Sequence, residues 1–576
     1  MKTPKLDLAT ERHIWPSKTQ FRMSVMSFAI GLGNFWRLPP LVMRNGGGAF
    51  LIPYTIMVVI LCFPLFYIEL AVGQLFRKGS IGVWKSIHPA LAGVGVAATS
   101  VCYLVAIYYN GIVAYVLYYL YQALSPKLPW VDCPIEPAHY RNECLKADSV
   151  PAFFFNRIAL DTSNSISEFR NFRPNIFGCL VISWAIVYAS VRRGVKTSGY
   201  VMYFTCIFPY ITLVVFLVHA MTLDGAWEGL VILFKPDLSK VFDANVWLLA
   251  ATQGFFNFGI AFGGLIAYGS YNKGGHNVRG DCIKLTAANL ATSLLTIVWV
   301  FLIEGHHAHH KFYECNNEIF QDQGVANVAA ELKELKRVVE VESIAVTIRQ
   351  HNDLRCSFQD FLWNTTQGTG LAFVVFTEAI TMFPMRSVAS VVFYLMLLTL
   401  GLETHADLSA LLMRVLRGVV GVQLWEWAVR HHPACTFCSS YALLIIAFCE
   451  VVAIAYVYGA ERFSKSLHEA TGSRPGPFLT ICWKYIDPPL MLIIFLASAG
   501  KSLLHSPKYM AYKSHVTKQV PEEFPWWGLI LAMAIVLVTT LPIPLAALHT
   551  HVRTVVKSLE DNLNGTDKYA TDQVVD

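Results

Sequence analysis

The chain has 576 residues, of which 55% are hydrophobic and only 15% are charged, and its net charge is +6. Soluble domains seldom have such a composition, and apolar segments of about 20 residues recur along the chain, which favours one integral membrane bundle over about four soluble domains. The Lys and Arg residues lie mainly in short loops between apolar runs, where they set membrane topology, so the positive charge does not indicate nucleic-acid binding.

Eleven apolar segments are predicted to be membrane-spanning helices, so the expected fold class is an all-α polytopic membrane protein. The first segment follows Arg12 and Lys18 and contains glycines and an arginine, which is typical of a span rather than a cleavable signal peptide. In chain order the predicted spans are 20–43, 49–73, 93–120, 176–191, 200–222, 245–269, 284–303, 387–413, 441–458, 485–504 and 528–548.

Basic loops predict the orientation of these spans. The short loops after the second, fourth and sixth spans carry clusters of Lys and Arg that include Arg77, Arg192 and Lys273. Because Lys and Arg are enriched in cytoplasmic loops, we expect these loops and the N-terminal tail to face the cytoplasm.

Two of the opposite loops contain pairs of cysteines. Cys133 and Cys144 share one polar loop, and Cys315 and Cys356 share another, which also contains a glycosylation sequon at Asn364. If both loops are extracellular, each pair could form a disulfide.

The segment 414–440 does not fit this topology. The predicted spans on either side of it are both followed by basic loops, so both would run inward, which requires an outward crossing between them. The apolar stretch there, 419–429, would reach only about 16 Å as a helix, whereas the hydrocarbon core is about 30 Å thick. We therefore predict that the ninth of twelve nominal spans is missing or truncated.

Two spans are interrupted by residues that disfavour a continuous helix. The span 20–43 contains Gly31, Gly33 and Asn34, and the span 245–269 contains a Gly-rich run at 256–264. Paired broken spans in two halves indicate a midplane site in an inverted-repeat transporter, although two Gly-rich packing faces are the alternative. The predicted segments are a cytoplasmic tail (1–19), a first five-span repeat (20–222), a second repeat (223–458, with an extracellular loop at 304–386), the last two spans (459–550) and a cytoplasmic tail (551–576).

The motifs at 31–37 and 45–50 resemble the signature of the neurotransmitter:sodium symporters, and the runs 376–381 and 443–450 resemble its B0-type neutral amino-acid and imino-acid branch. The resemblance implies sodium-dependent symport of a neutral amino or imino acid across the plasma membrane by alternating access. It also implies a single-span ancillary glycoprotein as a partner. Two alternatives are a non-transporting or defective member that acts as a partner-binding subunit, and a substrate-gated channel.

The resemblance implies two sodium sites. The first would use the Ala29 carbonyl with Asn34, Asn257 and Asn289, and the substrate carboxylate would complete it. These are oxygen ligands, which suit a hard cation, although interhelical hydrogen bonding is the alternative role for Asn34 and Asn289. The second site would use the backbone carbonyls of Ser27, Ile30 and Leu400 and the side chains of Glu403 and Thr404.

The substrate would lie beside Gly31, where monoamine-transporting relatives carry an Asp. A glycine leaves room for the substrate's own carboxylate to approach sodium, an attraction that is strong in a low dielectric. Tyr109 and the amides of Leu32 and Gly33 would hold that carboxylate. The substrate side chain would contact Val105, Phe256, Gly259, Phe262 and Leu408.

The resemblance also implies a chloride site formed by Tyr54, Gln253, Asn257 and Ser293. Chloride-independent bacterial relatives have a carboxylate where Ser293 stands, and without it an anion is expected to balance the sodium. Asn257 replaces the usual Ser or Thr of the family, and its amide can both donate and accept hydrogen bonds.

Two gates are expected around the site. Arg12 and Trp15 match the cytoplasmic gate, with Tyr271 nearby, and Arg37 matches the outer gate, with Phe256 as an aromatic lid. The acidic partners expected near 418 and 439 are absent, and both absences fall in the anomalous segment.

Other motifs point away from enzyme chemistry. There is no ATP-binding Gly-rich Lys motif and no nucleophile elbow, so neither a pump nor a hydrolase is supported. The His-rich run 304–310 is expected to be a solvated loop outside the seventh span, with metal binding as the alternative.

Overall fold

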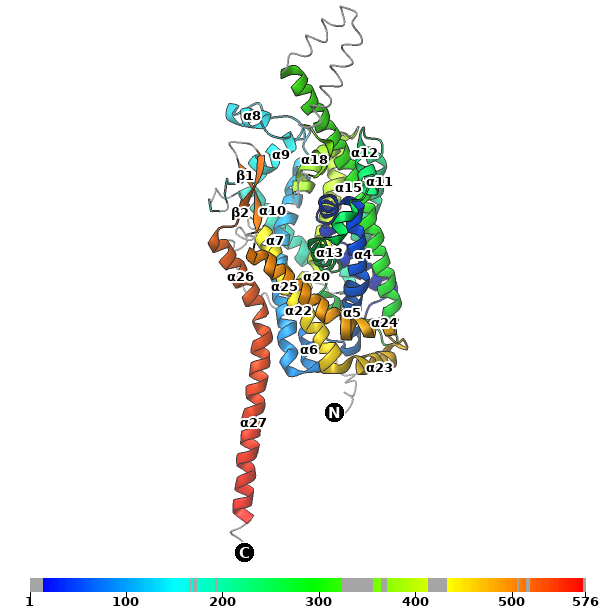
Figure 1. Cartoon of the computed structure of the whole chain (residues 1–576), viewed down its shortest axis with the longest axis vertical. Coiled ribbons are helices and arrows are strands. Elements are labelled where there is room, and N and C mark those ends of the chain that lie inside the picture. The colour runs from blue at the N-terminus through cyan, green and yellow to red at the C-terminus, as the bar shows by residue number, and fades with distance from the viewer. Residues whose placement is uncertain are drawn as a thin grey trace, which may run out of the picture.

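The computed structural model describes residues 14–165, 167–168, 173–191, 195–322, 356–363, 370–412, 432–504, 507–513 and 518–572. Within these residues the chain is a bundle of helices with one small β-hairpin (Figure 1). The described helical segments that are long and apolar enough to cross a membrane are Gly47–Phe76, Pro89–Ala123, Tyr203–Ala220, Val278–Cys315, Tyr441–Thr471, Pro477–Ser502 and Trp526–Ser558. The expectation of a predominantly helical polytopic membrane protein is therefore confirmed.

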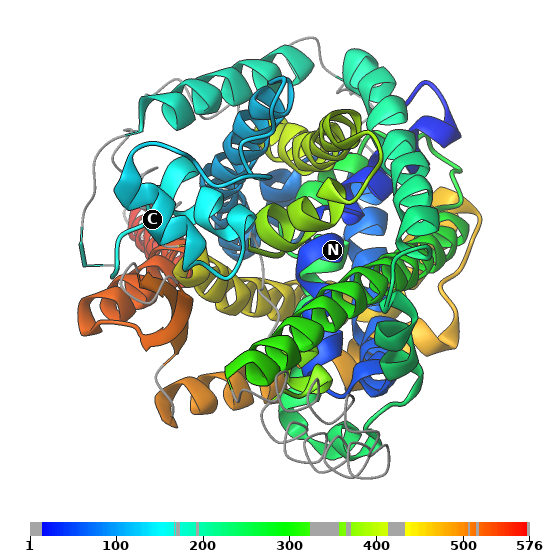
Figure 2. The ribbon, with the colours of Figure 1, turned by 90° about the horizontal axis from the view of Figure 1, so that it is seen from above.

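The first predicted span is broken into three helices, α1 (Lys18–Ala29), α2 (Leu32–Trp36) and α3 (Leu38–Arg44). Ile30 leaves the helical conformation and Gly31 is extended, with φ −105° and ψ −170°. Viewed from above in Figure 2, the blue helices of this segment lie inside the bundle, with later segments of the chain around them. The predicted interruption at Gly31 is thus present in the structure.

The sixth predicted span is broken in a similar way into α13 (Ala244–Phe258) and α14 (Gly264–Gly269). The connection contains three residues with positive φ, at Gly259 (62°), Ala261 (69°) and Gly263 (75°). Glycine adopts this conformation without a steric penalty, whereas Ala261 does not, so the surrounding contacts must hold it there.

The remaining helices form a scaffold around the two breaks. The longer ones are α5 (Phe63–Phe76), α7 (Ala92–Ala123), α10 (Pro174–Val191), α11 (Val195–Ala220), α15 (Val278–Asp322), α20 (Arg386–Leu412), α22 (His432–Val452), α25 (Asp487–Leu504), α26 (Trp526–Thr540) and α27 (Pro542–Asp572). The shorter ones are η1 (Gly47–Phe50), α4 (Leu51–Met57), η2 (Val58–Cys62), α6 (Ser80–Ile87), η3 (Pro89–Leu91), α8 (Ala138–Leu145), α9 (Val150–Phe153), η4 (Phe154–Ala159), α12 (Ala226–Phe234), η5 (Leu238–Phe242), α18 (Phe358–Trp363), η6 (Leu371–Val375), α19 (Phe376–Thr381), η7 (Ala453–Gly459), α23 (Ala460–Thr471), α24 (Pro477–Ile481) and η8 (Cys482–Ile486).

Part of the predicted extracellular loop 304–386 is instead helical. α15 continues without interruption through the His-rich run 304–310, so the expectation of a loop there was wrong. Glu304 is fully buried and His306 lies 2.7 Å from the Asp224 carbonyl, so packing and hydrogen bonding hold this extension in place. The described residues contain no group of three or more His, Cys, Asp or Glu that could hold a metal ion.

η6 shows that the same predicted loop also enters the core. Every residue of this element is buried, and the Phe373 ring lies 4.9 Å from Tyr119 of α7 and 6.4 Å from Tyr394 of α20, between ring centroids. Such aromatic pairs bury large areas and fix the element against the two helices.

The C-terminal region differs from its prediction in two respects. The expected span 528–548 is divided between α26 and α27 at Leu541 and Pro542, and the expected tail 551–576 is helical as far as Asp572. Figure 1 shows α27 extending far away from the rest of the bundle. Residues 413–431, in the anomalous segment, lie outside the described part of the chain.

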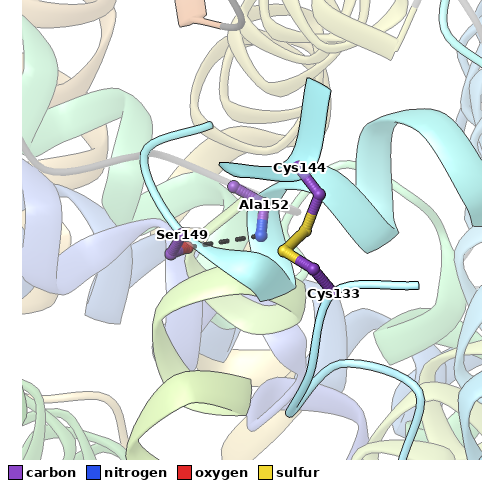
Figure 3. Close-up of a disulfide and its surroundings, with 4 residues drawn as sticks. All are labelled: Cys133, Cys144, Ser149 and Ala152. Carbon is purple, nitrogen blue, oxygen red and sulfur yellow. Dashed lines mark hydrogen bonds between the residues drawn. A yellow bond between two sulfur atoms is a disulfide. The ribbon is translucent and has the colours of Figure 1, made fainter. Parts of the chain in front are cut away.

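The two predicted cysteine pairs both form disulfides, Cys133–Cys144 and Cys315–Cys356. Figure 3 shows the first of them beside the start of α9, where the Ser149 hydroxyl accepts a hydrogen bond from the Ala152 N–H at 3.3 Å and caps the helix. Asn364, the predicted glycosylation site, lies outside the described residues.

The hairpin of β1 (Lys508–Lys513) and β2 (Lys518–Glu523) was not anticipated. Its strands are antiparallel, with Lys508 opposite Glu523. Glu522 pairs with Lys513 and accepts a hydrogen bond from Tyr509 at 2.9 Å, and these contacts lower the pKa of the Glu522 carboxyl.

Two glycines allow α5 and α14 to touch along their backbones. A Cβ atom at Gly73 would stand 2.1 Å from the Ile266 carbonyl oxygen, and one at Gly269 would stand 2.2 Å from the Leu70 carbonyl oxygen. Small residues at a helix crossing permit such close approach in membrane proteins. α14, and with it the second break, is thereby held against α5.

We expect Gly73→Ala to lower the melting temperature of the purified protein in detergent, because the new methyl group must push α14 away, at a cost of about 1–3 kcal/mol. The matched control is Gly178→Ala in α10, where nothing lies within 4 Å of the added atom. Equal melting temperatures for the two variants would show that α5 and α14 are not in close backbone contact.

Candidate functional site

Asn289 of α15 connects the two broken spans. Its amide nitrogen donates to the carbonyl of Ala29 at 3.0 Å and to the carbonyl of Asn257 at 3.1 Å. Ala29 is the last residue of α1, and Asn257 is the penultimate residue of α13. Carbonyl groups at helix ends lack intrahelical partners, so the breaks expose these two oxygens at one place in the bundle.

Two more of the predicted sodium ligands are buried oxygens without hydrogen bonds. Among the described residues, the side-chain amide oxygens of Asn34 and Asn289 accept no hydrogen bond, although both residues are buried. Unpaired buried amides are costly, and a hard cation such as sodium is bound by uncharged and carboxylate oxygens. The predicted first sodium site is therefore made of oxygens that suit this ion.

Three residues of the predicted second sodium site border a small cavity. Ser27, Ile30 and Leu400 line it together with Tyr210 and Thr292, whose hydroxyls lie 2.8 Å apart. The backbone of Glu403, Thr404 and Leu408 belongs to α20, but their side chains fall outside the described set.

The predicted substrate residues lie on three elements. Leu32 and Gly33 are in the first turn of α2, where backbone N–H groups lack helical partners. Val105 and Tyr109 are one turn apart on α7 and therefore share a face of that helix. Phe256, Gly259 and Phe262 lie at the second break, where a Cβ atom on Gly259 would stand 2.3 Å from the ring of Phe28.

The predicted chloride residues also come together. Gln253 donates from its side-chain amide to the Asn257 amide oxygen at 2.7 Å, and the Asn257 amide nitrogen donates to the Tyr54 hydroxyl at 2.7 Å. The hydroxyl of Ser293 on α15, the fourth of these residues, has no hydrogen-bond partner among the described residues. All four residues are buried.

An aromatic layer closes the site on the predicted cytoplasmic side. The Trp15 backbone N–H donates to the Tyr271 carbonyl at 3.0 Å, and its indole N–H donates to the Tyr268 carbonyl at 3.1 Å. The Trp15 ring stacks on Tyr268 and meets Tyr271 edge-on, each at a centroid distance of 5.9 Å. Arg12 lies outside the described residues.

A cation–aromatic contact stands at the predicted outer gate. The Arg37 guanidinium lies 4.0 Å from the centroid of the Phe256 ring. Such contacts are strengthened when they are shielded from water. Both predicted gate pairs are thus in contact: Trp15 with Tyr271, and Arg37 with Phe256.

The sequence analysis missed an ion pair on the same side as Trp15. Arg22 of α1 donates to Asp281 of α15 at 2.7 Å, and His276 lies 2.7 Å from the other oxygen of that carboxylate. The loop 270–284 was assigned to the cytoplasm from its charge, but nothing in the pattern indicated that α1 would reach it.

A second missed residue is Glu69 of α5. One of its oxygens accepts a hydrogen bond from the Ala261 N–H at 2.7 Å, within the second break. A carboxylate inside an apolar span is by default functional, so the presence of Glu69 within the predicted span 49–73 could have indicated a functional role. This bond explains how the strained backbone of Ala261 is held.

Comparison with known proteins places these features in a family. The model of the sodium:neurotransmitter symporter family matches residues 12–421 and 433–554. Mouse sodium-dependent neutral amino acid transporter B(0)AT1 is 34% identical, over 96% of this chain and 93% of the relative. Mouse B(0)AT3 is 35% identical, over 95% and 94%, and human sodium-dependent neutral amino acid transporter SLC6A17 is 34% identical, over 94% and 80%. The family match is interrupted at 422–432, inside the predicted anomalous segment.

We expect Asn289→Ala to weaken sodium binding by about tenfold or more, because the change removes one ligand oxygen and frees two buried carbonyls. Sodium-dependent thermal stabilisation of the purified protein would measure the affinity. Thr296→Val is the control, since among the described residues its hydroxyl bonds only to the Thr292 carbonyl of its own helix. Unchanged sodium affinity in Asn289→Ala would exclude this cluster as the binding site.

Proposed function

Because this chain belongs to the sodium:neurotransmitter symporter family, we propose that it is a sodium-coupled symporter of neutral amino acids in the plasma membrane. The observation that carries the proposal is the bridge from Asn289 to the two helix ends, together with the buried amide oxygens of Asn34 and Asn289 that accept no hydrogen bond among the described residues. Several relatives are named sodium-dependent neutral amino acid transporters, which supports the substrate class.

The ligand chemistry supports an amino acid rather than a monoamine. The proposed first sodium ligands, from Ala29, Asn34, Asn257 and Asn289, are all uncharged, so a negative charge must come from elsewhere. Gly31 has no side chain that could supply it. A substrate carboxylate entering beside Gly31 would provide both the charge and the last oxygen, at close range in a low dielectric.

The side-chain part of the substrate would be apolar or small. Val105, Phe256 and Phe262 present hydrocarbon surface, and Val105 and Phe262 are each only 6% exposed. A charged substrate side chain would lose its hydration there without gaining a partner.

We further propose that transport proceeds by alternating access in a 5+5 inverted-repeat bundle whose ninth span is missing or truncated. The contacts at Trp15 and Tyr271 and at Arg37 and Phe256 close the site on two sides, which supports an occluded state. Rocking of one helix group against the other would then break one contact layer at a time.

Uptake by proteoliposomes tests the proposal. Radiolabelled leucine and proline are supplied outside, with an inward sodium gradient or with potassium on both sides. We expect concentrative uptake of at least one of them only with the sodium gradient. Equal uptake in potassium would refute sodium coupling, and sodium-dependent binding without uptake would identify a non-transporting member of the family.

We expect Gly31→Asp to abolish amino-acid uptake, because the added carboxylate would repel the substrate carboxylate and take its place on sodium. Gly31→Asn is the matched control, with the same shape and no charge, and should retain more of the uptake. If the two variants are equally impaired, steric crowding rather than charge explains the loss, and the carboxylate argument fails.

A further inference from the structure

The Asn257 side chain is bonded to two other residues of the anion site that the family resemblance implies. Its oxygen accepts from Gln253 and its nitrogen donates to Tyr54, each at 2.7 Å. Tyr54, Gln253 and Asn257 are each no more than 2% exposed. Three of the four residues expected around an anion are therefore already bonded to one another, whereas the Ser293 hydroxyl has no hydrogen-bond partner among the described residues.

Helix geometry produces this arrangement. Gln253 and Asn257 are four residues apart on α13, so their side chains share one face of the helix, where amide pairs form hydrogen bonds. Tyr54 reaches the same amide from α4. A Ser or Thr, the usual residue of the family here, offers one hydroxyl in place of the amide, so it has no side-chain carbonyl oxygen and no side-chain N–H.

An anion would have to displace this amide. Chloride is held by N–H and O–H donors, but the Gln253 amide donates to the Asn257 oxygen, which carries partial negative charge and would repel an anion. Moving that oxygen away would leave the buried Asn257 carbonyl without a partner, because chloride can accept the Gln253 N–H but cannot donate a hydrogen bond to that oxygen. These residues therefore do not fit chloride.

We propose that Asn257 takes the place of chloride in this protein, so that sodium binding does not require chloride. The Asn257 amide oxygen accepts the hydrogen bond that chloride would accept, but it does not supply the negative charge of chloride. Asn257 also accepts from Asn289 through its backbone carbonyl at 3.1 Å. The residue thus belongs to the sodium cluster through its main chain and to the former anion site through its side chain.

A binding measurement on the purified full-length protein tests this inference without transport. Sodium is titrated as the chloride or the gluconate salt, and thermal stabilisation gives the half-saturating sodium concentration. We expect the two values to agree within about twofold, whereas an allosteric anion usually changes affinity by about fivefold or more. A shift of that size in the wild type overturns the proposal.

Asn257→Ser should recreate an anion site and make sodium affinity depend on chloride by about fivefold or more. Thr252→Ser, on the same helix but bonded only to the Leu248 and Leu249 carbonyls, is the matched control and should stay independent of chloride. If Asn257→Ser does not fold, Asn257→Ala is measured in its place. If neither variant folds, the wild-type titration alone tests the proposal. A folded Asn257→Ser that remains indifferent to chloride contradicts the role of the amide.

Leucine uptake in chloride or gluconate provides a second readout, which rests on the proposed symport. Equal uptake in both salts supports the inference, and uptake that requires chloride overturns it. If no uptake occurs in either salt while sodium affinity is the same in both, the symport proposal fails and the assignment of Asn257 stands.

Discussion

The structure depends on what happens to backbone carbonyl groups when a helix stops inside a membrane. In the hydrocarbon region an unpaired carbonyl is costly, so a broken helix is tolerated only where protein groups or a bound ion satisfy its ends. Here the ends of α1 and α13 are placed together, and the single amide of Asn289 donates to both. That amide has two donor hydrogens and one acceptor oxygen, so satisfying both carbonyls leaves its own oxygen without a hydrogen bond among the described residues.

The rest of the bundle can be understood as support for the two breaks. Glu69 fixes the peptide of Ala261, and the close contact between Gly73 and Ile266 holds α14 against α5. On the side of the chain termini, the Arg22–Asp281 pair and the Trp15 contacts bind α1 to later segments. Because α1 carries Ala29 at its end, any movement of α1 also moves a carbonyl of the proposed sodium cluster. The proposed binding and gating steps would therefore be mechanically linked through one short helix.

The chemistry of the breaks could be predicted from the sequence because it is local. Three local patterns each indicate a structure directly: glycine at positions that need positive φ, asparagine inside apolar spans, and cysteine pairs in polar loops. The predicted helix breaks and both predicted disulfides are confirmed. The ligand assignments of Glu403, Thr404 and Leu408 stay predictions, since their side chains lie outside the described residues.

Long-range partners could not be predicted in the same way. The extension of α15 through 304–310 depends on packing against elements far away in the chain, and the Arg22–Asp281 pair joins residues 259 positions apart. Composition and spacing contain no information about such contacts. The segment 414–440 is an intermediate case: its length argues against a span, and the break in the family match at 422–432 agrees with that argument.

Asn257 shows how one residue type can set the ionic requirement of a site without changing its framework. The backbone at this position is determined by the end of α13, so its carbonyl stays in the proposed sodium cluster whatever side chain is attached. The side chain, in contrast, decides whether Gln253 and Tyr54 are bonded internally or available to an external anion. Because main chain and side chain serve different neighbours, an exchange between hydroxyl and amide can alter anion dependence while leaving the sodium ligands in place. Such a change requires no movement of a helix, which makes this position a natural point of divergence within one fold.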